Sequence, residues 1–216
     1  MTVSFQPARV FDFRGKTAVV TGGGNGIGQG VAQALAVAGA KVAVFDHDAQ
    51  AAKATCERIE AQGGEAWSYT VDVAQEAQVA AAMQSFHNHV GHVDILINNA
   101  GIAIRRPTLE LSLADWQKVL DVNLTGVFIC ARAAARFMVP RQSGCIVNTA
   151  SIMGLSGGGL YPNISYQSTK GAVVNLTRAL AVEWAGAKVR VNAIAPTWVR
   201  TDFIKPLLAQ EDLVQR

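Results

Sequence analysis

The stretch Thr17-Ala-Val-Val-Thr-Gly-Gly-Gly-Asn-Gly-Ile-Gly28 decides the fold of this chain. It begins with an apolar, β-branched run, turns through a cluster of glycines, and continues from Ile27 into a helical pattern. A strand, a glycine turn and a helix N-terminus in this order suit a dinucleotide pyrophosphate, because glycines let the ligand approach the backbone and the helix N-terminus attracts negative charge. The stretch therefore predicts the first βα unit of a parallel α/β sheet.

A second motif, Tyr166-Gln-Ser-Thr-Lys170, places a phenol and an ammonium group four residues apart. Residues at this spacing lie on the same face of a helix. The first motif can therefore hold a nucleotide, and the second can move a proton. Together they predict an oxidoreductase that uses a nicotinamide cofactor.

The chain resembles the short-chain dehydrogenase/reductase family from about Lys16 to Thr201, with the family motifs in order. The matching motifs are Thr21-Gly-x-x-x-Gly26-x-Gly28, Asn98-Asn-Ala-Gly101, Asn123, Ser151 and Tyr166-x-x-x-Lys170. A glycine motif alone would be weak support, because glycine turns are common. The resemblance implies a dehydrogenase that acts on a CH–OH group and is similar to sugar and polyol dehydrogenases and to 3-oxoacyl-ACP reductases.

Apolar patterns along the chain alternate between strand-like and helix-like periods. Short, mostly continuous apolar runs predict strands covered on both faces, at Thr17–Thr21, Lys41–Phe45, Glu65–Val71, Val93–Asn98, Cys145–Thr149 and Val189–Ile194. Helical patterns lie between them, at about Ile27–Ala38, Ala49–Gln62, Gln75–Val90, Leu113–Val139 and Ser165–Trp184. Repeated strand–helix units without a linker predict a single-domain Rossmann fold over residues 1–216, a doubly wound parallel sheet flanked by helices on both faces.

The bulk properties exclude several classes of protein. Half of the 216 residues are hydrophobic and the net charge is +3 without a dense Lys/Arg run, so nucleic-acid or membrane-surface binding has no support. No apolar run reaches the length of a membrane span, and the N-terminus has no secretory apolar region. Three scattered cysteines fit reduced thiols. We therefore expect a cytoplasmic protein.

Asp46 is expected to select NAD over NADP. It ends the second predicted strand, where a carboxylate can accept hydrogen bonds from the adenosine ribose and would repel a 2′-phosphate. No Arg or Lys stands beside it, and Asn25 occupies a position where NADP-preferring relatives often carry a base. Both features favour NAD as the cofactor.

The remaining cofactor contacts are implied by the family resemblance. Asp72-Val73 resembles the pair that contacts adenine, and Pro196, Val199 and Thr201 resemble the segment that holds the carboxamide. Thr197 stands where the family usually has glycine, so the path of that loop is open. Asn98 is expected to be structural. The expected cofactor-binding residues are Gly22, Asn25, Gly26, Ile27, Gly28, Asp46, Asp72, Val73, Asn99, Ala100, Gly101, Tyr166, Lys170, Pro196, Val199 and Thr201.

The expected catalytic residues are Asn123, Ser151, Tyr166 and Lys170. A free tyrosine has a pKa near 10, so a base at neutral pH requires a phenol whose pKa is lowered by about three units. Lys170 and the oxidised nicotinamide ring would supply the positive charge. The resemblance implies that Ser151 hydrogen-bonds the reacting oxygen and that Asn123 holds a water linking Lys170 to solvent, although a locally satisfied amide is the alternative for Asn123.

Other polar residues are given structural or pocket-lining interpretations. The spacing of His87, His89 and His92 does not bring them to one helix face and no carboxylate pattern accompanies them, so no metal is expected. Tyr161 is followed four residues later by Ser165 rather than a lysine, which suits the wall of a substrate pocket. That pocket should draw on residues 102–106, 152–163 and the region after Thr201.

The substrate is expected to be a secondary alcohol or ketone of small size. The compact polar segment Gly157–Asn163 resembles sugar and polyol dehydrogenases of the family, which favours a polyol, sugar or sugar acid. A 3-oxoacyl-ACP reductase-like enzyme and a catalytically silent NAD-binding protein are the alternatives. Arg105-Arg106 could attract an anion, although paired loop arginines are more often simply solvated.

The C-terminal region carries two further expectations. Nothing after Thr201 provides the last strand that family members usually have, so Val189–Ile194 should form an exposed sheet edge and the sequence is expected to lack that part of the family's domain. The family also implies a homo-oligomer, a dimer or tetramer. The helices around Leu113–Val139 and Ser165–Trp184 would form its interface.

Overall fold

The computed structural model describes residues 11–158 and 160–210. Within them one parallel sheet has the strand order β3-β2-β1-β4-β5-β6. The strands are β1 (Thr17–Thr21), β2 (Lys41–Asp46), β3 (Glu65–Thr70), β4 (Ile95–Asn98), β5 (Gly144–Thr149) and β6 (Val189–Ile194). The order reverses between β1 and β4, as in a doubly wound sheet. The predicted Rossmann fold is confirmed.

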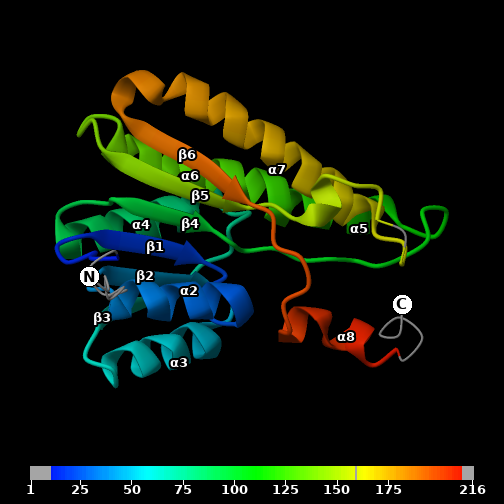
Figure 1. Ribbon diagram of the computed structural model, residues 1–216, viewed down its shortest axis with the longest axis horizontal. Coiled ribbons are helices and arrows are strands. Elements are labelled where there is room, and N and C mark those ends of the chain that lie inside the picture. The colour runs from blue at the N-terminus through cyan, green and yellow to red at the C-terminus, as the bar shows by residue number, and fades with distance from the viewer. Residues whose placement is uncertain (1–10, 159, 211–216) are drawn as a thin grey trace, which may run out of the picture.

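Helices cover both faces of the sheet (Figure 1). On one face lie α2 (Gly26–Val37) and α3 (Ala49–Glu60), and on the other lie α4 (Glu76–Val90), α6 (Gly126–Met138) and α7 (Ile164–Glu183). The shorter elements are α5 (Leu113–Leu120), η1 (Asp121–Thr125), η2 (Ile152–Gly154), η3 (Ala185–Ala187), η4 (Asp202–Ile204) and α8 (Lys205–Leu208). Gly91 ends α4 in the left-handed conformation that its position predicts.

The sheet has a hydrophobic core on each face, and successive side chains of the central strands pack into one core and then the other. In β1, Val19 packs in the cluster beneath α4 and α6, while its neighbour Val20 packs in the cluster beneath α2 and α3. Leu96 and Ile97 of β4 divide between the same two clusters. Successive strand residues point to opposite faces. A strand covered on both faces is therefore apolar at every position, which explains the continuous runs that the sequence shows.

The two edge strands differ from this expectation. β3 was expected to be covered on both faces, but its six residues are half-buried or exposed. In β6, Val189 and Val191 are buried while Arg190 and Asn192 are exposed. Each strand lacks a neighbour on one side among the described residues, so less of its surface is covered. β4 also begins at Ile95 rather than at Val93.

The expected helix Leu113–Val139 is not continuous. The structure divides it into α5, the π-helical turn η1 and α6. Asn123 lies in η1 and is fully buried. A π-helical turn places one extra residue in the helix, and such turns are frequent at functional sites.

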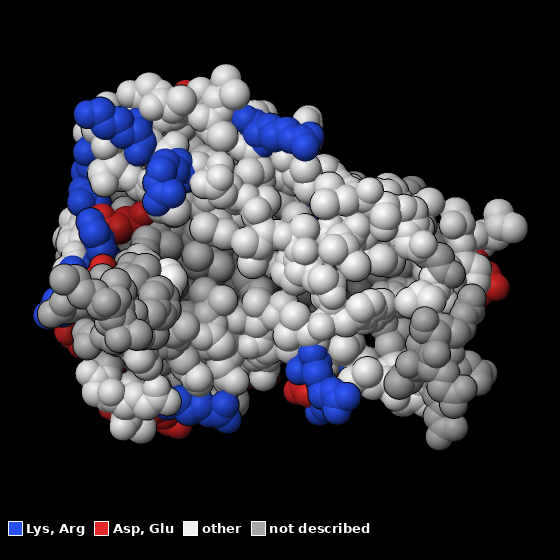
Figure 2. All heavy atoms as spheres, in the orientation of Figure 1, with Lys and Arg blue, Asp and Glu red and all other residues white. Residues whose placement is uncertain are grey.

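On the face shown in Figure 2, the described Lys and Arg residues form small separate groups near the rim, and the middle of that face is uncharged. No helix in the part of the chain that the structure describes is long and apolar enough to cross a membrane.

Candidate active site

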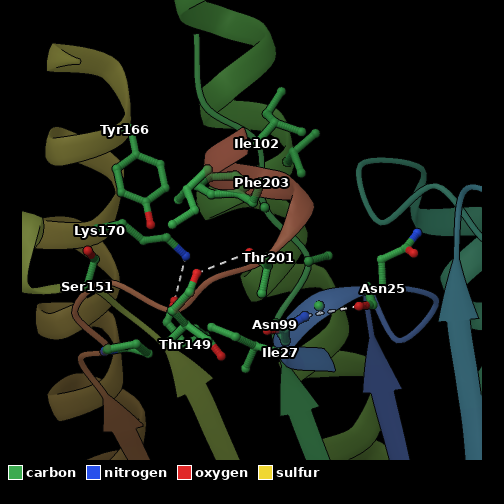
Figure 3. Close-up of a pocket in the computed structure, with 18 of the residues that line it drawn as sticks. Asn25, Ile27, Asn99, Ile102, Thr149, Ser151, Tyr166, Lys170, Thr201 and Phe203 are labelled. Carbon is green, nitrogen blue, oxygen red and sulfur yellow. Dashed lines mark hydrogen bonds between the residues drawn. The ribbon is translucent and has the colours of Figure 1, made fainter. Parts of the chain in front are cut away.

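A cavity of about 560 Å³ lies at the carboxyl ends of the strands, beside the point where the strand order reverses. This is where ligands bind in open parallel α/β sheets, and the volume suits a small-molecule site. Figure 3 shows Tyr166 and Lys170 of α7 on one side of the cavity and Asn25 of the glycine turn on the other. The cavity therefore joins the two motifs that are far apart in the sequence.

The glycine turn closes tightly against the end of β4. Gly22 has φ +61°, and a Cβ added there would lie 2.8 Å from the Cα of Ala100. Asn99 donates from Nδ2 to the carbonyl oxygens of Thr21 (3.2 Å) and Gly22 (3.1 Å). A Cβ at Gly28 would clash with the Gly22 carbonyl. The turn is thus shaped by close backbone contact, and it presents the N-terminus of α2 to the cavity.

Asp46 ends β2 with its carboxylate almost buried, at 7% exposure. Its Oδ2 accepts from the backbone N–H of Gly24 at 2.8 Å, and its Oδ1 accepts from the backbone N–H of Asp48 at 3.0 Å. The Nδ1 of His47 lies 3.1 Å from the same Oδ1. These contacts hold the carboxylate beside the glycine turn on the cavity wall.

Tyr166 and Lys170 lie one turn apart on α7, with the lysine Nζ 5.6 Å from the centroid of the phenol ring. Nζ donates to the carbonyl oxygen of Thr149 at 2.5 Å, at the end of β5 (Figure 3). Burial disfavours the charged ammonium and lowers the pKa of Lys170 to about 8.

The pKa of the Tyr166 phenol was expected to be lowered, but the residues of this chain alone raise it. Burial is the largest influence and raises the pKa of Tyr166, while the Ser151 hydroxyl and the positive charge of Arg105 act in the opposite direction. Lys170, whose own pKa is lowered by burial, is not among the groups that shift the pKa of the phenol in the chain without a cofactor. A lowered pKa for the phenol requires a further positive charge in the cavity, such as an oxidised nicotinamide ring.

Ser151 lies directly after β5 and caps the short helix η2. Its Oγ accepts from the backbone N–H of Met153 at 3.1 Å, which leaves the hydroxyl hydrogen available to donate. The side chain is buried on the cavity wall close to Tyr166. It can therefore hydrogen-bond an oxygen that also faces the phenol.

Asn123 is placed behind the cavity rather than on its wall. Its Oδ1 accepts from the backbone N–H of Ile102 at 2.8 Å, and its Nδ2 donates to the Ile102 carbonyl at 2.9 Å and to Thr169 Oγ1 at 3.2 Å. Both amide hydrogens are therefore used by the protein. A Cβ added to Gly101 would lie 3.4 Å from Asn123 Oδ1 and 3.6 Å from Lys170 Nζ, so Asn123 lies close to Lys170.

The structure brings nearly all of the expected site residues to one cavity. Those on its wall are Gly22, Asn25, Gly26, Ile27, Asp46, Asp72, Val73, Asn99, Ala100, Gly101, Ser151, Tyr166, Lys170, Pro196, Val199 and Thr201. Gly28 and Asn123 lie behind the wall. Asn98 is structural, as expected, because its Nδ2 donates to Asn148 Oδ1 at 2.9 Å and to the Val127 carbonyl at 3.3 Å.

The histidines take no part in the cavity except His47. The ring of His87 stacks on Phe137 with centroids 4.4 Å apart, and Nε2 of His92 lies 3.0 Å from the buried Asp94. No cluster of potential metal ligands occurs among residues 11–158 and 160–210.

Several cavity residues were not anticipated. His47, Lys118 and Val122 lie on the wall, and the Thr149 carbonyl is the hydrogen-bond acceptor for Lys170. The role of Thr149 depends on a main-chain atom, which no side-chain pattern can reveal. Tyr161 does line the cavity, as expected.

The chain belongs to the short-chain dehydrogenase family, because the sequence model of that family matches residues 16–212. It is 41% identical over 211 residues to the 2-dehydro-3-deoxy-D-gluconate 5-dehydrogenase of Bacillus subtilis (strain 168), covering 95% of this chain and 81% of that protein. It is 38% identical over 196 residues to a 3-oxoacyl-[acyl-carrier-protein] reductase of Synechocystis sp. (strain ATCC 27184 / PCC 6803 / Kazusa), covering 90% of this chain and 78% of that protein.

A crystal structure from Beutenbergia cavernae is similar over most of this chain. It is provisionally assigned as an NAD(P)-dependent gluconate 5-dehydrogenase and holds NADP at low occupancy. The TM-score is 0.88 at 39% identity, with 94% of this chain and 80% of that chain covered. The family fixes the general activity, an oxidoreductase acting on a CH–OH group with a nicotinamide dinucleotide.

Proposed function

We propose that this chain is an NAD-dependent dehydrogenase that transfers a hydride between NAD and a secondary alcohol or ketone, namely a polyol, sugar or sugar acid. The observation that carries the proposal is that Tyr166, Lys170 and Ser151 share one cavity with the glycine turn and Asp46. The similarity to a sugar-acid dehydrogenase supports this choice of substrate.

The proton transfer is assigned to Tyr166. NAD⁺, when bound, would supply the hydride acceptor for the carbinol carbon. Tyr166 as phenolate would take the proton from the substrate hydroxyl. Ser151 donates a hydrogen bond to the same substrate oxygen and so orients it. In the reverse direction, Tyr166 returns its proton to the carbonyl oxygen.

Lys170 and Asn123 are assigned supporting roles. Lys170, held by the Thr149 carbonyl, would contact the nicotinamide ribose and, in its ammonium form, would add positive charge near the phenol. Because both side-chain hydrogens of Asn123 are used, a water relay at this residue would involve its main-chain carbonyl or the second lone pair of Oδ1. The relay remains a proposal that rests on the family resemblance.

The preference for NAD rests on Asp46. A 2′-phosphate at this position would meet a buried carboxylate, and like charges at short range in a partly desolvated site repel strongly. Asp46 is also held rigidly by two backbone donors, so it cannot easily turn away.

The enzyme is further proposed to be a homo-oligomer. Leu113 of α5, Phe128 of α6 and Val182 of α7 are exposed apolar side chains on the helices where the family resemblance implies an interface. Light scattering measures the state directly. A monomer at micromolar concentration would contradict this proposal without affecting the catalytic assignment.

Nicotinamide absorbance tests the proposed function. The protein is mixed with NAD⁺ or NADP⁺ and with sugar alcohols, sugar acids or 3-hydroxyacyl thioesters. We expect turnover with NAD⁺ and a polyol, sugar or sugar acid. Turnover confined to the thioesters with NADP⁺ would instead support the 3-oxoacyl-ACP reductase reading, which the similarity to the Synechocystis enzyme favours. NAD binding without turnover of any substrate would contradict the proposal.

A further inference from the structure

The two neighbouring arginines of the loop after β4 have different environments. Arg106 is exposed and its Nε lies 3.9 Å from a carboxylate oxygen of Asp115. Arg105 is half-buried, and its guanidinium carbon lies over two aromatic rings, 5.5 Å from the centroid of Tyr161 and 5.3 Å from that of Phe203. The solvated interpretation therefore fits Arg106 and does not fit Arg105.

Arg105 has unused hydrogen-bond donors. Its Nη2 makes a long contact of 3.4 Å to the Phe203 carbonyl, and its buried Nε has no acceptor among the described residues. No carboxylate in the described ranges forms an ion pair with Arg105, and Asp202, which precedes Phe203 in the chain, is paired with Lys205 at 2.6 Å. A buried donor without a partner is costly, and a guanidinium cannot lose its proton to avoid that cost.

This cation lies close to the reacting groups. Tyr161 and Phe203 line the cavity, and the ring centroid of Phe203 is 5.9 Å from that of Tyr166. The positive charge of Arg105 also acts to lower the pKa of the Tyr166 phenol, so the two groups interact electrostatically. Figure 3 shows Phe203 next to Tyr166. Arg105 itself is not among the residues that line the cavity, but its guanidinium packs against two rings that do, those of Tyr161 and Phe203.

We propose that Arg105 binds a carboxylate of the substrate, which makes a sugar acid rather than a neutral polyol or sugar the preferred substrate. This inference rests on the proposed function and narrows it. The Nε–H and an Nη–H form one edge of the guanidinium, and that edge matches the two oxygens of a carboxylate. A carboxylate that reaches it replaces the long contact to Phe203 and satisfies the unpartnered Nε.

The aromatic residues position the guanidinium and exclude water from it. The ring of Tyr161, over which Arg105 lies, packs edge-on against Trp198 with centroids 6.1 Å apart. Arginine stacked on aromatic rings keeps its fork in a fixed orientation. An ion pair in a partly desolvated site is also stronger than one in water. The arrangement therefore favours an anionic end group over a hydroxymethyl group.

D-gluconate and D-sorbitol form a matched pair of probes, because they share a carbon chain and differ in one end group. Binding of each to the full chain saturated with NAD⁺ is measured by calorimetry, and kcat/KM is measured where turnover occurs. We expect the wild-type protein to bind D-gluconate about tenfold or more tightly than D-sorbitol.

Three variants distinguish the role of Arg105. In Arg105→Gln the preference for D-gluconate should fall by about ten- to a hundredfold through KM, while the affinity for NAD⁺ changes little and any change in kcat, through the lost positive charge near Tyr166, is shared by both substrates. Arg105→Lys should restore part of the preference, because it keeps the charge without the fork. Arg106→Gln, the control, should leave the preference within about twofold, because its ion pair is exposed.

The outcomes separate this inference from the proposed function. Turnover of D-sorbitol by the wild-type protein with no preference for D-gluconate, or a preference that survives in Arg105→Gln, overturns the assignment of Arg105 and leaves the dehydrogenase intact. If no alcohol is bound or turned over in the presence of NAD⁺, both the assignment of Arg105 and the proposed function are overturned. Normal NAD⁺ affinity of Arg105→Gln shows that the variant is folded.

Discussion

The Nζ of Lys170 donates a hydrogen bond to the carbonyl oxygen of Thr149, so the amine of α7 is fixed to the end of β5. Both residues lie on the cavity wall, and Lys170 is only 3% exposed. A buried ammonium with a single protein acceptor is costly to keep charged. The relationship therefore links the geometry of the site to the stability of the fold.

The first prediction concerns the pH dependence of this burial. The pKa of Lys170 is lowered from 10.5 to about 8 in the folded chain, so the unfolded chain binds more protons between these pH values. Stability contributed by this group must then rise as pH increases from about 8 to about 10.5. Relative to Lys170→Met, the free energy of unfolding of the wild-type protein should increase by about 3 kcal/mol over that window.

Urea denaturation of both proteins at several pH values measures the difference. The pKa of Tyr166 is raised and gives an opposite trend at high pH, so both proteins are compared in a Tyr166→Phe background, where this trend is absent. A difference that stays constant across the window would show that Lys170 is not destabilised by burial.

The second prediction concerns cofactor choice. Asp46→Asn keeps an oxygen acceptor for the Gly24 N–H but removes the negative charge beside the ribose. The ratio of kcat/KM with NAD⁺ to that with NADP⁺ should fall by about ten- to a hundredfold. Glu57→Gln removes a charge from the exposed pair with Lys53 and is the control, with an unchanged ratio. An unchanged ratio in Asp46→Asn would exclude Asp46 as the selecting residue.

The third prediction concerns the glycine turn. Gly22→Ala should destabilise the protein by about 2 kcal/mol or more, because φ is +61° and the new Cβ would meet the Ala100 backbone. Gly30→Ala in α2 has no atom within 4 Å of its Cβ and should stabilise the protein by about 0.5–1 kcal/mol. Denaturation curves of the two variants measure both effects. Equal effects would mean that the turn is not tightly packed.

Much of the fold could be predicted because the central strands are buried on both faces. Apolar runs such as Thr17–Thr21 matched the observed strand bounds, and the glycine turn fixed the first βα unit. The edge strand β3 was expected to be covered on both faces like these strands, although its own residues carry the signal that distinguishes it. Its sequence, Glu65–Thr70, carries polar residues on both faces.

The π-helical turn at Asn123 shows a different limit. The apolar period of residues 113–139 is compatible with one continuous helix, and the insertion of one residue into a turn leaves little trace in that period. Asn123 was recognised as an unusual buried amide. Its partner Ile102 contributes main-chain atoms from a distant loop, which only the folded chain identifies.

The residues of the candidate site could be predicted because they belong to sequence motifs of the family. The difference between Arg105 and Arg106 could not be predicted, because it depends on Tyr161 and Phe203, which come from two other segments of the chain. The direction of the pKa shift of Tyr166 was also beyond the sequence, since burial outweighs the favourable contacts.

The central claim is that Tyr166 transfers the proton in a reaction that uses NAD. The most direct measurement compares the turnover and NAD⁺ affinity of Tyr166→Phe with those of the wild-type protein. We predict that turnover falls about a hundredfold or more. The affinity for NAD⁺ should stay within about tenfold, because at most one hydrogen bond to it is lost. Turnover close to that of the wild-type protein would contradict the account.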